Sequence, residues 1–142
     1  MDIELLGDLL YGPARILYGS RLSDENLLEA THETFGAQVV CIVRNWMLID
    51  VKLTGRHERL VKTNGLQPTL LYANKVVSAN ATENLSQGVL SGFQYRYEDC
   101  FFASDDMLYV LGGRGSRKSA EVPAVFALSQ QCGGEFRVDD GR

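Results

Sequence analysis

The chain is poor in the residues that most often bind metals or form disulfides. Its 142 residues include two histidines, His32 and His57, and three cysteines, Cys41, Cys100 and Cys132. The histidines lack the short paired spacing of zinc ligands, and an odd number of widely spaced cysteines indicates no disulfide framework. We therefore expect no metal site and no cofactor, and no motif assigns a catalytic residue.

Long hydrophobic runs are also missing. No apolar run approaches the roughly 18 residues that a membrane-spanning helix needs. The sequence begins Met1-Asp2-Ile3-Glu4, which is acidic where a secretory signal peptide is basic. These two features predict a cytoplasmic protein that makes no contact with membranes.

The overall composition is that of a globular protein. Hydrophobic residues make up 45% of the chain and charged residues 23%, so neither a disordered nor a fibrous class is indicated. A chain of this length buries enough surface for one hydrophobic core. We expect a single domain over residues 1–132 and a disordered tail over residues 133–142.

Three segments have the spacing and end signals of helices, namely residues 1–11, 23–36 and 55–65. In the second segment, the Ser23 hydroxyl can accept a hydrogen bond from an unpaired backbone N–H of the first turn. Gly36 supplies the C-terminal stop of the same segment. We expect the third segment to be a short helix that faces solvent.

Strands are indicated where β-branched and aromatic residues gather, in residues 38–53, 69–77, 93–97, 100–103 and 107–111. The first of these is either a hairpin that turns near Arg44 or one long bulged strand. The last two predict a hairpin. Together with the helices, the strands predict an α+β domain in which N-terminal helices pack on an antiparallel sheet.

The remaining segments are less regular. Residues 78–87 are rich in serine, asparagine and threonine and predict a surface loop. Residues 122–128 form one more apolar element, either a helix or an edge strand. Between residues 111 and 122 the glycines predict an exposed loop.

That glycine-rich segment, residues 112–119, is the part of the sequence most suggestive of chemistry. Flexible glycines can direct backbone N–H groups at an anion, and nearby cations and a hydroxyl can hold it. The candidate anion-binding or partner-binding residues are Arg114, Arg117, Lys118 and Ser119. The segment is not a P-loop, because Arg117 stands where the glycine before the Lys-Ser pair is required. A solvated loop without ligand is the alternative.

Charge is unevenly distributed along the chain. Residues 1–35 carry seven acidic and two basic residues, a net charge of −5, whereas residues 44–75 carry six basic and two acidic residues, a net charge of +4. Either the two regions are solvated or attract each other, or the acidic helix docks on a basic partner. The candidate acidic surface consists of Asp24, Glu25, Glu29 and Glu33.

Four segments of the middle region share a pattern with a known family. They are Cys41-Ile42-Val43-Arg44-Asn45-Trp46, Leu71-Tyr72-Ala73-Asn74-Lys75-Val76-Val77, Cys100-Phe101-Phe102 and Tyr109-Val110-Leu111-Gly112. Over roughly residues 36–128 the chain resembles the DUF6957 family of small uncharacterised proteobacterial proteins, which often occur near prophages or mobile elements. The resemblance implies no enzyme and transfers no catalytic residue. It implies an accessory role.

Three functional hypotheses follow. The first is a non-catalytic protein-binding module, encoded by a phage or mobile element, that inhibits a nucleic-acid-handling defence complex through its acidic surface, as an anti-CRISPR protein does. The second is a small enzyme or binder of a phosphorylated or nucleotide ligand at residues 112–119. The third is a homodimer formed at an exposed sheet edge. A pI of about 5.1 argues against direct nucleic-acid binding.

Overall fold

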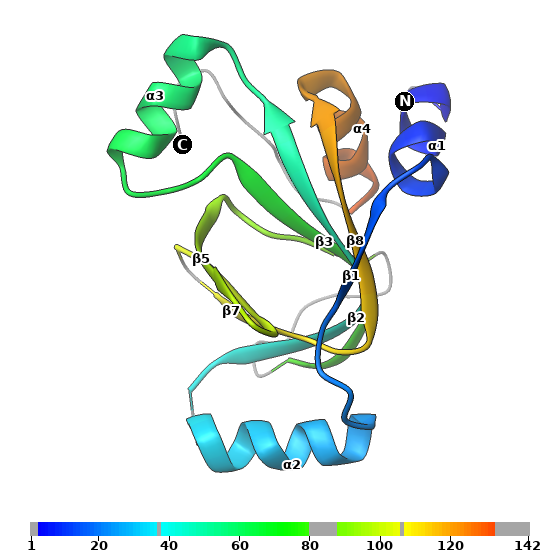
Figure 1. Cartoon of the computed structure of the whole chain (residues 1–142), viewed down its shortest axis with the longest axis vertical. Helices are drawn as coiled ribbons and strands as arrows, with labels where there is room; N and C mark the ends of the chain where they lie inside the picture. Colours follow the sequence, from blue (N-terminus) through cyan, green and yellow to red (C-terminus); the bar gives the residue numbers. More distant parts are fainter. Residues whose placement is uncertain (1–2, 37, 80–87, 106, 133–142) are drawn as a thin grey trace.

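A mixed β-sheet organises the protein. The computed structural model describes residues 3–36, 38–79, 88–105 and 107–132, which form four helices and one eight-stranded sheet (Figure 1). The α+β class is as expected. In chain order the elements are α1 (Ile3–Tyr11), β1 (Arg15–Tyr18), α2 (Asp24–Phe35), β2 (Val40–Lys52), α3 (Gly55–Thr63), β3 (Thr69–Ala79), β4 (Val89–Leu90), β5 (Gln94–Glu98), β6 (Phe101–Ser104), β7 (Leu108–Leu111), β8 (Arg114–Glu121) and α4 (Val122–Gln131).

The long strand β2 is the axis of the sheet. β3 pairs antiparallel with one of its edges, while its other edge is shared by β7, along residues 40–43, and β8, along residues 47–52. Between these two stretches Asn45 has a positive φ of 52°, and the register with β3 shifts between Ile42 and Val43. The segment is therefore one bulged strand, and the hairpin alternative is wrong.

The bulge in β2 faces a kink in the chain beside it. β7 and β8 are two halves of one path parallel to β2, interrupted only at Gly112 and Gly113. Gly113 has a φ of 68°, which favours glycine, and the Gly112 N–H donates to the Val43 carbonyl at 2.8 Å. The glycine-rich segment is thus a tight kink followed by a strand, and the prediction of a loop over residues 112–119 is wrong.

Sequence reasoning missed β8 because its residues, Arg-Gly-Ser-Arg-Lys-Ser-Ala-Glu, are poor strand formers. Tertiary context decides the conformation, since β8 pairs with β2 on one side and with β1 on the other. β1 itself was not predicted, and its outer edge has no strand partner within the described residues. The parallel pairs of β2 make the sheet mixed, although an antiparallel sheet was expected.

On the other side of β2 the strand pairings close on themselves. β5 pairs with β6, β6 with β7, and β7 with β2. The ring is completed through β3, because the Gln67 N–H donates to the Gln94 carbonyl and the Ser91 N–H to the Leu71 carbonyl, both at 2.8 Å. The sheet is curled into a small barrel-like layer.

One core cluster lies inside this curl and draws its buried members from strands alone. They are Cys41, Val43, Trp46, Leu48, Leu71, Ala73, Phe102, Tyr109 and Leu111. The inward residues of β2 are odd-numbered before Asn45 and even-numbered after it. The exchange of faces falls at Asn45, where the positive φ interrupts the extended backbone, while the pairing with β3 keeps its register from Arg44 opposite Lys75 to Trp46 opposite Ala73.

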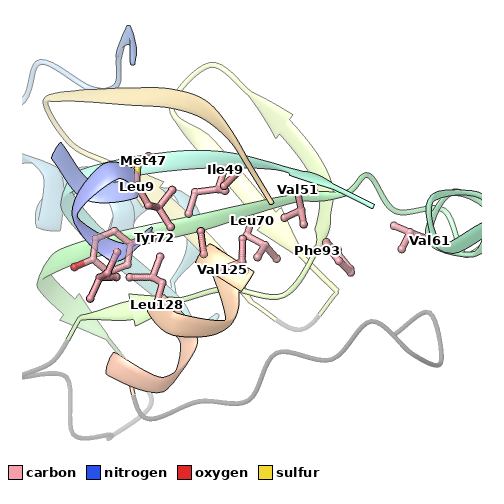
Figure 2. Close-up of a cluster of buried hydrophobic side chains, with 13 residues drawn as sticks. Leu9, Met47, Ile49, Val51, Val61, Leu70, Tyr72, Phe93, Val125 and Leu128 are labelled. Carbon is pink, nitrogen blue, oxygen red and sulfur yellow. The ribbon is translucent and has the colours of Figure 1, made fainter. Parts of the chain in front are cut away.

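The helices cover the outer face of the sheet in two groups. Figure 2 shows the larger outer cluster, in which α1 and α4 pack Leu9, Val125 and Leu128 against Met47 and Ile49 of β2. At the opposite end of β2, Leu27 of α2 packs on a separate buried cluster formed with Val40, Ile42 and Val110. Figure 1 shows α2 at one end of the molecule, apart from the other three helices.

Most predicted helices are confirmed by their ends. Ser23 caps α2 by accepting a hydrogen bond from the Asn26 N–H, and Gly36 follows its last turn. Residues 122–128 belong to a helix, α4, with Pro123 in its first turn. The predicted tail over residues 133–142 and most of the loop predicted over residues 78–87 lie outside the described residues.

A substitution at Gly115 tests how closely β8 packs on the core cluster inside the curled sheet. A Cβ atom on Gly115 would lie 2.3 Å from the Trp46 indole, which is 2% exposed. We expect Gly115→Ala to lower the free energy of unfolding by about 1–3 kcal/mol through overpacking, as measured by urea denaturation.

Gly7 in α1 provides the control, since a Cβ atom there meets nothing within 4 Å. Gly7→Ala is expected to raise the free energy of unfolding by about 0.5–1 kcal/mol because alanine is the better helix former. Equal effects of the two substitutions would contradict the packing of Trp46 on Gly115.

Candidate functional site

Strand geometry divides the residues predicted to bind an anion. Successive side chains of β8 point to opposite faces, so Arg114 and Lys118 lie on the outer face and Arg117 and Ser119 on the other. The register agrees, because Lys118 is opposite the outward Ile49, whereas Arg117 is opposite the inward Leu48. The structure therefore does not bring the four predicted residues together into one site.

Arg117 is already paired within the protein. Its Nε donates to Oδ2 of Asp50 at 2.8 Å and its Nη2 to Oδ1 at 2.7 Å, and the Thr69 hydroxyl donates to the same Oδ1 at 2.8 Å. Such a two-bond contact uses the Nε–Nη2 edge of the guanidinium. Arg117 thus joins β8 to β2 and is withdrawn from the set of anion-binding candidates.

This pairing sets the protonation of Asp50. Partial burial raises the pKa of Asp50, but the hydrogen bonds from Arg117 and Thr69 and the positive charges of Arg117 and Arg15 outweigh it, so the pKa is lowered. The carboxylate stays ionised over a wide pH range. It acts as a structural ion in the sheet.

The outer face of β8 lines a cavity of about 460 Å³ between the C-terminal end of α1 and the sheet. Arg114, Ser116 and Lys118 contribute from β8, Asn45 contributes from β2 and Asn74 from β3. Sequence reasoning missed the two asparagines. Asparagine is depleted in strands, so its presence inside two strand-forming segments was the available signal.

The acidic helix α2 carries the second candidate site, and the structure removes Asp24 from it. Nε of Arg44 donates to Oδ1 of Asp24, and Nη2 of Arg44 donates to the Leu22 carbonyl at 2.8 Å. Asp24 therefore fastens α2 to β2 next to the bulge. Its charge is neutralised by the protein itself.

The other three acids of the surface remain free. Glu25, Glu29 and Glu33 are exposed, and within the described residues none of them forms an ion pair or hydrogen bond with a side chain. Spaced four residues apart, they lie along one side of α2. Leu28, which is 41% exposed, adds an apolar side chain next to this row. We call Glu25, Leu28, Glu29 and Glu33 the α2 outer face.

The residues that could act as nucleophiles are held in structural environments. Burial raises the pKa of the Cys41 thiol to about 11, so this thiol is protonated at neutral pH. All three cysteines are free. Nδ1 of His57 lies 3.0 Å from the hydroxyl of Thr54, the N-cap of α3. Among the described residues, no three histidine, cysteine, aspartate or glutamate side chains are grouped as a metal site would need.

Comparison with known proteins identifies a family but no activity. A family model described as a domain of unknown function, DUF6957, matches residues 18–127. The match therefore includes α2 and extends further toward the N-terminus than the resemblance in the sequence suggested. No curated protein and no solved structure matches the chain. Within the described residues, no helix is both long enough and apolar enough to span a membrane.

The pairing of Asp50 predicts a pH-dependent contribution to stability. A lowered pKa in the folded state stabilises the fold above the unfolded pKa of about 3.9, and this contribution is lost as the pH falls through the folded value. Asp50→Asn is expected to be less stable than the natural protein at pH 7, with a difference that shrinks on acidification. Urea denaturation at a series of pH values measures it, and a constant difference would contradict the assignment.

The contacts of Arg44 predict that α2 can be loosened selectively. Arg44→Ala removes the bonds to Asp24 and to the Leu22 carbonyl, so amide hydrogen exchange in α2 should accelerate while β2 and β3 stay protected. Arg96→Ala serves as the control, because Arg96 forms an exposed ion pair with Glu98 on β5. Equal exchange in both variants would show that Arg44 does not anchor α2.

Proposed function

Because this chain belongs to the DUF6957 family, a domain of unknown function, we propose its role from its surface: it is a non-catalytic module that binds a basic protein partner through the α2 outer face. The observation that carries the proposal is the row of Glu25, Glu29 and Glu33. These three carboxylates are exposed on one side of a helix and have no cation beside them in the described chain.

The stability of α2 does not explain the row of three glutamates. Like charges four residues apart destabilise a helix by about 0.2–0.5 kcal/mol per pair. The helix is held by other residues, namely Leu27 in its cluster with Val40, Ile42 and Val110, the Arg44–Asp24 pair and the edge-to-face contact of Phe35 with Phe101, whose ring centroids are 5.7 Å apart. The glutamates are free to serve a partner.

The composition of the α2 outer face suits a protein partner. Carboxylates steer a basic surface toward the helix, and Leu28 offers an apolar contact beside the row. The position of α2 at one end of the molecule, seen in Figure 1, leaves room for a partner to approach. Adjacent carboxylates rise about 6 Å along the helix, which allows each to meet a separate cation.

A surface of this kind competes for cationic sites that normally bind phosphate groups. The partner in this proposal is a nucleic-acid-handling defence complex in the bacterial cytoplasm. The protein would be its inhibitor, encoded by a phage or a mobile element of a proteobacterium, as anti-CRISPR proteins are.

Charge reversal tests the α2 outer face. The triple variant Glu25→Lys, Glu29→Lys, Glu33→Lys is expected to lose the protein captured from a proteobacterial lysate by the tagged natural chain, as read by mass spectrometry. Excess DNA oligonucleotide should displace that protein from the natural chain, because both compete for one basic surface.

A second triple variant controls for net charge. Glu4→Lys, Asp105→Lys, Glu121→Lys alters three exposed acids away from α2 and also moves the net charge from −4 to +2, since each substitution adds two charges. It should retain the captured protein. Loss in both variants, or in neither, would rule out the α2 outer face as the binding site.

A further inference from the structure

The cavity on the outer face of β8 lies beside the C-terminal end of α1, which contributes Leu9, Leu10 and Tyr11 to its lining. α1 packs over one end of the outer face and α2 over the other, and the cavity opens between them beside the bulge of β2. Its volume of about 460 Å³ falls within the usual range of small-molecule sites, about 300–1,000 Å³.

The floor of the cavity is a row of side chains in register across four strands. Ile16 of β1 is opposite Ser116 of β8, Ser116 is opposite Met47 of β2, and Met47 is opposite Tyr72 of β3. Leu9 of α1 closes the inner end, and Figure 2 shows Leu9, Met47 and Tyr72 together at one end of the outer cluster. The floor is therefore built on four paired strands, and its apolar members Met47 and Tyr72 are 5% and 7% exposed.

The rim of the cavity is polar and carries only positive charge. The side chain of Arg114 is exposed and makes no hydrogen bond or ion pair with the described residues, and Asn45 and Asn74 line the same cavity. Among the described residues that line the cavity, none is acidic. An anion entering here meets a guanidinium fork that no carboxylate already occupies.

Lys118 has a structural role that leaves it partly available. Its Nζ donates to the Asp8 carbonyl at 2.6 Å, near the C-terminal end of α1, where a cation favours the helix dipole. An ammonium group has three donors, so two remain. Arg114 has no such structural partner among the described residues. Its substitution therefore tests ligand binding without removing a contact that holds the fold.

We propose that this cavity binds a small organic anion, with a flat apolar body on the Met47–Tyr72 floor and a phosphate or carboxylate on Arg114. Tyr11, which is 86% exposed on the rim, supplies an aromatic face for the bound body. This site is separate from the α2 outer face and does not depend on the proposed protein partner. Arg117 and Ser119 take no part in it.

The test is a titration of the isotope-labelled full chain followed by amide NMR. Adenosine 5′-monophosphate represents phosphates and benzoate represents carboxylates, while adenosine and inorganic phosphate supply the body or the anion alone. At least one of the two anionic probes should shift the amides of Asn45, Met47, Gly115 and Ser116. If that probe is adenosine 5′-monophosphate, it should bind more tightly than adenosine or inorganic phosphate alone. The stronger probe identifies the anion.

Arg114→Ala should weaken binding of that probe by about tenfold or more, while Arg56→Ala, at an exposed arginine on α3, should leave it unchanged. Because the Arg114 side chain is exposed and has no partner among the described residues, the variant should keep the spectrum of a folded chain. The proposal is overturned if neither probe shifts these amides, or if both arginine variants weaken binding equally.

Discussion

The structure depends on one geometric match, in which the exchange of faces in β2 at Asn45 lies beside the glycine kink between β7 and β8. Three residues of β2 separate Val43 from Met47, whereas four residues separate their partners Leu111 and Ser116, so the neighbouring chain shifts its register by one residue at the kink. Gly112 and Gly113 allow that shift, and the kink is held by the bond from Gly112 to the Val43 carbonyl and the bond from the Gly113 N–H to the Ser20 carbonyl. Arg44 packs its guanidinium against the same two glycines.

This match creates the two surfaces that carry the functional proposals. Before the kink in the chain, β7 is part of the closed ring of strands, and Arg44 fastens α2 beside it. After the kink, β8 leaves that ring and pairs with β1, which widens the outer face of the sheet. The cavity opens at this widening, and none of the described residues that line it belongs to α2. A protein partner and a small ligand could therefore be bound at the same time.

The charges of β8 show why proximity in sequence is a weak guide to a site in a strand. Arg114, Arg117, Lys118 and Ser119 lie within six residues, yet alternation places them on two faces. One arginine completes a structural pair with Asp50 and the other is left free. The same alternation places Arg114 in the lining of one cavity with Asn45 and Asn74, which are distant from it in sequence. A cation whose side chain has no partner among the described residues remains a candidate for binding an anion.

The sequence by itself determined the local elements: the cap of α2 at Ser23, its end at Gly36, the β6–β7 hairpin, the α+β class and the exposed glutamates of α2. Each follows from interactions within a few residues, which local chemistry specifies. Tertiary structure alone decided that β8 is a strand, that the sheet is mixed, and that Asp24 and Arg117 are neutralised by Arg44 and Asp50. These outcomes depend on partners 20 to 67 residues away in the chain, whose approach no local pattern encodes.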